Sequence, residues 1–216
     1  MLLWAVTGKS QHLNIQPVIP IKLSEDWNLI VRTILPVAAW QSPAPGIGDH
    51  SGLSDTTQSF FFSPSVSNGG VTWGIGPALL YPTATDDSLG NKRFGAGPTF
   101  VILKQDSGWT YGVLANHIWS FASVGSGGSN VNSTFLQPFV NYTFPNSFGI
   151  TLNAQATYNW ITDQWSAPVS LLFSRIFKFG AQPVSFQIGP KYYVSTVTNG
   201  PRWGGVFNVT FLFPAK

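Results

Sequence analysis

The chain has no cysteine among its 216 residues. It therefore cannot form a disulfide framework, and it offers no thiolate as a nucleophile or a metal ligand. Its three histidines, His12, His50 and His117, are far apart in the sequence and predict no metal cluster. We expect neither a metal ion nor another cofactor.

Charged residues are also scarce. They make up 9% of the chain, whereas about 25% is usual in soluble proteins. The formal net charge is +3 and no run of lysines and arginines occurs, so nucleic acid is not an expected partner. The acidic residues fall in expected turns, loops or a strand start, and no two share the middle of a strand face. Paired carboxylates for general acid–base catalysis are therefore not predicted, and we do not expect an enzyme.

Long apolar runs are missing as well. Without a run of about 20 apolar residues, a membrane-spanning helix is excluded. The opening segment MLLWAVTGKSQ lacks the basic start, apolar stretch and cleavage site of a signal peptide. No stretch keeps a period of 3.6 residues, so we expect almost no helix.

What the chain has instead is strict alternation of apolar and polar residues. Residues 147–160, SFGITLNAQATYNW, change character at every position. Side chains of a strand point alternately to its two faces, so this segment predicts one long strand, apolar on one face and polar on the other. An ordinary strand has about 5–6 residues. Similar alternation occurs in 71–81, 109–121, 183–194 and 207–213.

Aromatic residues gather near both ends of the apolar faces. They are Trp73, Tyr81, Trp109, Tyr111, Trp119, Phe121, Phe148, Tyr158, Trp160, Phe211 and Phe213. Two aromatic girdles around an apolar band about 25 Å tall are typical of outer-membrane barrels. A soluble β-sandwich also alternates, but its strands are shorter and its outward faces carry charge. Backbone groups in lipid must be paired, which requires the sheet to close. We therefore predict an all-β, antiparallel, up-and-down transmembrane barrel in a bacterial outer membrane.

Eleven strands of this kind can be placed. They are expected near 12–22, 27–38, 54–63, 71–82, 94–105, 109–121, 133–144, 147–160, 164–177, 182–194 and 203–213. Bacterial barrels have an even number of strands, short periplasmic turns and longer external loops. The pattern therefore predicts twelve strands in a single domain over 1–216, truncated at its N-terminus, with the first strand missing or reduced to about 3–6. An open seam is expected between 12–22 and 203–213.

Several segments resemble a known family. LNIQPVIPI, QSFFFSP, WGIGPALLYPTATD, GAGPTFVILKQ, YGVLANHIWSF, LQPFVNYTF and VTFLFP are similar to words of Gram-negative outer-membrane "transporter" barrels. Members are also labelled phenol-degradation meta-pathway proteins, and some bacterial ones "neuromedin U". The resemblance runs from about residue 8 to 214. It implies a barrel that moves small, hydrophobic or aromatic compounds. The partners expected of such a barrel are outer-membrane lipid, the barrel-assembly machinery and a small-molecule solute.

The inward faces predict a polar lumen. Their polar residues are Asn14, Gln16, Arg32, Thr72, Thr99, Asn116, Gln137, Asn141, Asn153, Gln155, Asn159, Gln187, Lys191 and Asn208. Arg32 and Lys191 are expected at mid-depth without an acid to offset them, unless Asp55 or a loop folds inward. Cationic patches favour anions in pores, so we predict a weak anion preference, or a solute that carries a carboxylate or phenolate. Barrels of about eight strands fill with side chains and those of about 16–18 leave a channel, so a narrow pore and a plugged lumen both remain open.

Three other features have a functional and a simpler interpretation. Asp86 and Asp87 offer oxygens to Ca²⁺, but EF-hand spacing is missing and we expect a solvated loop. The motifs GIGP, GAGP and QIGP lie inside strands, so they predict close packing and bulges rather than a phosphate-binding loop. His117 lies on the outward face, where a lipid-modifying enzyme would place it, but no serine shares that face within 109–121. The leading hypothesis is a passive channel, and the alternatives are a non-conducting structural barrel and a lipid-modifying enzyme.

Overall fold

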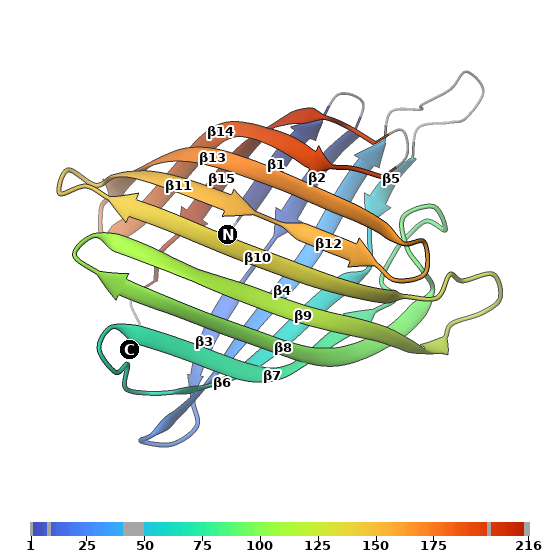
Figure 1. The fold of residues 1–216 in the computed structure, drawn as a ribbon, viewed down its shortest axis with the longest axis horizontal. Helices are drawn as coiled ribbons and strands as arrows, with labels where there is room; N and C mark the ends of the chain where they lie inside the picture. Colours follow the sequence, from blue (N-terminus) through green and yellow to red (C-terminus); the bar gives the residue numbers. More distant parts are fainter. Residues whose placement is uncertain (1, 8–9, 41–49, 198–199, 214–216) are drawn as a thin grey trace.

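The computed structural model describes residues 2–7, 10–40, 50–197 and 200–213, with side chains described for 12–37, 51–197 and 200–213. These residues form fifteen strands in a single antiparallel sheet and, within the described ranges, no helix. The sheet closes on itself because β9, the last strand of the order, also pairs with β10, next to its first strand β11. Figure 1 shows the resulting barrel from the side, with its strands inclined. The predicted all-β antiparallel barrel is confirmed.

The fifteen strands occupy twelve positions around the wall, because three pairs of consecutive strands share a position. The strands are β1 (Leu2–Thr7), β2 (Ser10–Ile15) with β3 (Val18–Lys22), β4 (Trp27–Trp40), β5 (His50–Leu53) with β6 (Thr56–Pro64), β7 (Val71–Tyr81), β8 (Arg93–Asp106), β9 (Trp109–Ser123), β10 (Asn132–Thr143), β11 (Phe148–Ala154) with β12 (Ala156–Asn159), β13 (Gln164–Phe179), β14 (Gln182–Ser195) and β15 (Trp203–Phe211). All eleven expected strands are present, with breaks near Pro17, Asp55 and Gln155.

The seam between the first and last expected strands differs from the prediction. The short strand expected near 3–6 is β1, and it lies between β2 and β15 and pairs with both. The seam is therefore closed where β1 runs. Farther along the same wall position, β3 pairs with β4 and, among the described strands, with no second neighbour. The open seam expected along the whole of 12–22 is wrong at the level of β2, because a strand of six residues already bridges it.

The barrel has two different ends, which we name by their connections. The turn end carries residues 23–26, 65–70, 107–108, 144–147 and 180–181, and the loop end carries 82–92, 124–131, 160–163 and the described residues 196–197 and 200–202 between β14 and β15. Non-glycine residues with positive φ, Ser107 and Ser147, help to form the tight turns. The long connection expected between the strands near 27–38 and 54–63 lies largely outside the described residues.

Glycine-proline pairs inside the strands allow the wall to pack closely. Gly76 of β7 and Gly97 of β8 each precede a proline, and Pro77 and Pro98 face each other in the ladder. A Cβ at Gly97 would collide with the backbone carbonyl oxygen of His117, and one at Gly76 with that of Phe60. The close packing predicted for GIGP and GAGP is therefore confirmed. Register shifts at Phe94/Gly95 and Ala167/Pro168 mark bulges.

The variant Gly97→Ala tests whether this close packing stabilises the barrel wall. We expect the variant to lose about 1–3 kcal/mol of unfolding free energy, the usual cost of forcing an extra carbon into a packed site. Urea unfolding in detergent, followed by tryptophan fluorescence, measures the change. Gly205→Ala in β15 is the matched control, because among the side chains and backbone that the structure describes its Cβ would meet no atom within 4 Å. Equal stability of the two variants would contradict the close-packing explanation.

Candidate functional site in the barrel lumen

The inner face follows the predicted alternation. In β7 the outward Trp73 and Ile75 are exposed, whereas Ala78 and Leu80 on the other face are buried. The buried polar residues Ser59, Thr99, Lys191 and Asn208 lie on inward positions of their strands, and Gln16 is buried in the break between β2 and β3. The predicted lumen residues are therefore on the inner face. Their part in selecting a solute remains a prediction.

Neighbouring amide and hydroxyl groups on the inner face pair with one another across strands. The amide nitrogen Nε2 of Gln137 donates to Oδ1 of Asn153 at 3.2 Å, and Thr151 donates to Asn141 at 2.8 Å. Nδ2 of Asn208 donates to Oε1 of Gln187 at 3.0 Å. The lumen wall is thus a partly self-satisfied hydrogen-bond network. Such a wall holds its polar side chains in place against the strands.

Arg32 lies beside a cavity inside the barrel. The cavity has a volume of about 270 Å³, and its lining also includes Asn116 of β9 and Ser133 of β10. Nη2 of Arg32 donates to Oε1 of Gln16 at 3.3 Å, which fixes one edge of the guanidinium. Because an arginine has five N–H donors, this bond leaves further donors for a solute. Within the described residues, Arg32 forms no ion pair.

Lys191 lies farther along its strand than Arg32 does. Arg32 is the sixth of the 14 residues of β4 counted from the turn end, whereas Lys191 is the tenth of the 14 residues of β14. The Lys191 side chain is buried and close enough to His12 of β2 for the two to interact electrostatically. Both cations therefore lie in the interior of their strands. That they share mid-depth in the lumen stays a prediction.

An apolar cluster narrows the same lumen. Ala78 and Leu80 of β7 pack with Ile118 of β9, and Val131 from the loop after β9 packs against them. Leu80, Ile118 and Val131 also line the cavity beside Arg32. Alternation identifies the first three as inward positions, but no sequence signal places Val131 there. The lumen is therefore more apolar on this side than its polar residues alone indicate.

The loop 82–92 folds back onto the barrel through a buried acid. Asp55 accepts hydrogen bonds from the backbone N–H groups of Ala84 and Asn91, at 3.3 and 2.6 Å, and from Nδ2 of Asn91 at 3.3 Å. Asn91 in turn lines the cavity. Thr83 and Thr85 add further hydrogen bonds to residues 53–56. An acid and an inward-folded loop thus lie near the loop end of the lumen. Asp55 therefore offsets part of the positive charge of Arg32 and Lys191, which weakens the predicted anion preference.

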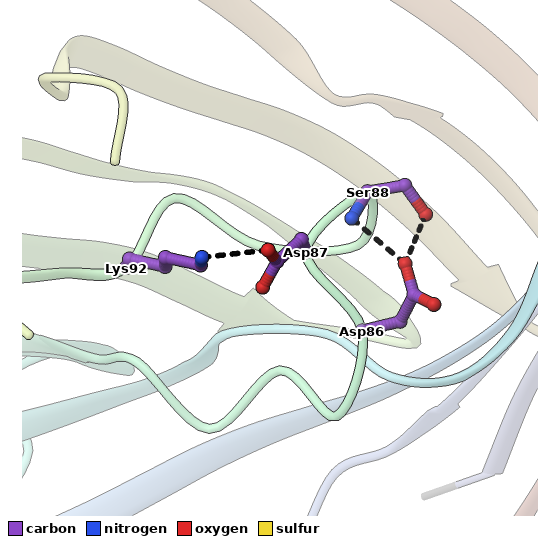
Figure 2. Close-up of polar contacts among 4 residues, drawn as sticks. All are labelled: Asp86, Asp87, Ser88 and Lys92. Carbon is purple, nitrogen blue, oxygen red and sulfur yellow. Dashed lines mark hydrogen bonds and ion pairs between the residues drawn. The ribbon is translucent and has the colours of Figure 1, made fainter. Parts of the chain in front are cut away.

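Asp86 and Asp87 lie on the outer part of this loop. Figure 2 shows Asp86 accepting hydrogen bonds from the backbone N–H and the hydroxyl of Ser88, and Asp87 paired with Lys92 at 2.7 Å. The Asp87 side chain is 82% exposed. The carboxylate oxygens of Asp86 and Asp87 therefore bind other residues of the same loop, in agreement with a solvated loop. Among the residues described, no group of three or more metal-ligating side chains occurs.

The outward face carries the predicted aromatic residues. Trp73, Trp109, Tyr111, Trp119, Phe121, Trp160, Phe211 and Phe213 are exposed, and Tyr81, Phe148 and Tyr158 are half-buried. Tyr81 donates to Gln58, and Gln58 donates to Thr33, so three polar groups interlock on the outside of β4, β6 and β7. The sequence prediction had not singled out Gln58. Placement of the aromatics at a membrane surface remains a prediction.

His117 has a hydroxyl partner on the neighbouring strand. Its Nδ1 lies 2.7 Å from Oγ1 of Thr134, and the same oxygen accepts from the indole N–H of Trp160 at 2.8 Å. The ring of Trp119 covers the imidazole, with centroids 4.1 Å apart. The carboxylate of Asp163 accepts a hydrogen bond from the hydroxyl of Tyr158. The Thr134 hydroxyl is thus already bound by two side chains, and the His117 ring is covered by Trp119. These contacts favour a role for His117 at the membrane interface over a catalytic role.

Comparisons with known proteins support the fold. Among solved structures, the chain is similar to an outer membrane channel from Pseudomonas putida F1, with a TM-score of 0.70 and 14% sequence identity. The match covers 98% of this chain and 93% of that chain. No protein-family model matches the sequence, and no curated protein matches it. The family resemblance of the quoted segments, with its phenol-degradation label, therefore stays a prediction. No helix in the described ranges is long and apolar enough to cross a membrane.

Proposed function

We propose that this protein is an outer-membrane channel for small solutes. The observation that carries the proposal is a closed barrel with an apolar, aromatic-rich outer face and a polar inner face around a cavity. Lipid outside and water inside require this distribution of side chains. The similar structure from Pseudomonas putida F1 is described as an outer membrane channel, which supports the same assignment. The turn end then faces the periplasm and the loop end the exterior.

The solutes that fit this lumen are small and carry an acidic group. Arg32 presents N–H donors to the cavity, Asn116 adds an amide, and Leu80 and Ile118 add apolar surface. A hydrophobic or aromatic carboxylate or phenolate complements this mixture, because its ring packs on the apolar side while its oxygens bind the guanidinium. Gram-negative outer-membrane localisation and passive transport are parts of the same proposal.

Single-channel recording in planar bilayers tests this function. The purified chain is expected to give small, reproducible conductance steps in simple salt. Benzoate is the probe solute, because it joins an aromatic ring to a carboxylate, and we expect it to reduce the current more strongly in the wild type than in Arg32→Gln. Lys104→Gln is the matched control, because Lys104 lies on the outward side of β8, opposite the exposed Tyr111.

A non-conducting structural barrel is the second candidate. The packing of Val131 on Ala78, Leu80 and Ile118, together with the fastened loop 82–92, favours it. Folded protein that inserts into the bilayer without any conductance step would support this alternative and contradict the channel. Heat-modifiable migration on gels identifies folded barrels independently of conductance.

A further inference from the structure

On the outer wall, the charged side chain of Arg175 is surrounded by aromatic residues. Arg175 of β13 lies on the outward face with Phe173 and Phe177, and its cross-strand partners are Phe148 and Phe186. Its guanidinium carbon lies 5.8 Å from the centre of the Phe177 ring. Within the described part of the chain, Arg175 has no hydrogen bond or ion pair. A cation that lacks an anionic partner on such a surface requires an explanation.

The position of Arg175 limits what it can contact. Phe177 is two residues nearer the turn at 180–181, so the guanidinium reaches toward the turn end of the barrel. Long basic side chains on membrane proteins extend in this way toward the interface. An arginine on the lipid face of a barrel is strongly destabilising at the bilayer midplane and costs little near the interfaces. Arg175 therefore fits a location close to lipid phosphates.

An apolar groove begins at the same residue. It has a volume of about 330 Å³ and is lined by Phe148 and Phe173 on one side and by Phe186, Ile188 and Phe207 on the other. The ring centroids of Phe148 and Phe173 are 6.4 Å apart, and those of Phe186 and Phe207 are 6.5 Å apart. Ile188 is 62% exposed inside this groove. A volume at the lower end of the usual range for ligand pockets, about 300–1,000 Å³, suits a narrow apolar chain.

We infer that this face of β11, β13, β14 and β15 binds one glycerophospholipid of the periplasmic leaflet, with its phosphate on Arg175 and an acyl chain in the groove. The inference rests on the proposed function for the orientation of the barrel in the membrane. Guanidinium groups bind phosphate oxygens through paired N–H donors. The exposed aromatic rings and Ile188 give the acyl chain a contact surface that a flat wall lacks.

Native mass spectrometry of the purified full chain in detergent tests the site. The probe lipid is phosphatidylglycerol, and the two comparison probes are diacylglycerol with the same acyl chains and inorganic phosphate. We expect one phosphatidylglycerol to be retained and neither comparison probe to bind as well. Arg175→Gln is expected to weaken retention about five-fold, the effect of about 1 kcal/mol per basic residue at an anionic lipid surface.

Two further variants separate the groove from general charge effects. Ile188→Trp fills the groove and is expected to reduce retention while leaving Arg175 in place. Lys104→Gln removes an outward cation of β8 and is expected to retain lipid as the wild type does. Unchanged retention in Arg175→Gln, or equal retention of diacylglycerol, would overturn the inference. Conductance is recorded separately from lipid retention. If the protein conducts ions but retains no lipid, only the lipid site is refuted. If it retains lipid but does not conduct, only the channel function is refuted.

Discussion

Replacing Asp55 with alanine is expected to free the loop 82–92 and to open the lumen at its loop end. The carboxylate of Asp55 accepts hydrogen bonds from Ala84 and Asn91, and it is buried. A hydrogen bond to a charged group contributes about 1.5–3 kcal/mol. Losing even one such bond shifts the equilibrium between the fastened and the released loop about ten-fold or more toward the released loop. We therefore expect a larger single-channel conductance and faster cleavage of the loop by proteinase K.

The hydrogen bonds of Thr83 and Thr85 limit this effect to part of the loop. Both threonines bind residues 53–56 independently of the Asp55 carboxylate. The barrel of Asp55→Ala should therefore fold and remain heat-modifiable, and the cleavage should fall in residues 86–91. This prediction separates the released loop from a globally unstable barrel, which would be cut at many sites.

Asp87→Ala is the matched control for the same loop. Asp87 pairs with Lys92 at the surface, as Figure 2 shows, and its side chain is largely exposed. Exposed ion pairs contribute only about 0–1 kcal/mol, so conductance and cleavage should stay close to the wild type. If Asp55→Ala and Asp87→Ala behave alike, Asp55 does not hold the loop against the lumen.

Alternation explains why the fold and the faces of the strands could be predicted. The side-chain period of a strand is two, so one correct assignment in a segment fixes the face of every other residue in it. Arg32 and Lys191 were assigned to the inner face in this way, and the structure agrees. The same alternation in 164–177 already places Arg175 among outward aromatics. A charge on an apolar face is therefore a signal that the sequence carries.

Depth and loop position could not be predicted from the same pattern. The depth of a residue depends on the stagger between strands, which the hydrogen-bond register sets and alternation does not encode. Alternation therefore places Arg32 and Lys191 on the inner face, and their shared mid-depth stays a prediction. Loops have no period, so nothing in the sequence places Asn91 and Val131 beside the cavity. Both residues are placed by contacts with distant strands.

The two cations of the inner face lead to a prediction about selectivity. Arg32 and Lys191 both lie on the inner face, and His12 lies within the electrostatic reach of Lys191. A unit charge about 8 Å from a permeating ion contributes about 2 kcal/mol at an effective dielectric constant of about 20, before screening by salt. Asp55 offsets part of this field, because its carboxylate lies near the loop end. We therefore expect a weak anion preference.

Reversal potentials in a salt gradient measure this preference and assign it to residues. Arg32→Gln is expected to lower the ratio of anion to cation permeability several-fold, and more than Lys191→Gln, because Arg32 lines the cavity. The double variant should lose the preference, and Arg32→Glu should favour cations, since an acid then replaces the cation at the same depth. Lys104→Gln on the outer wall should leave the ratio unchanged. A cation-selective wild type, or a ratio that the double variant does not alter, would contradict the assignment of selectivity to these two side chains.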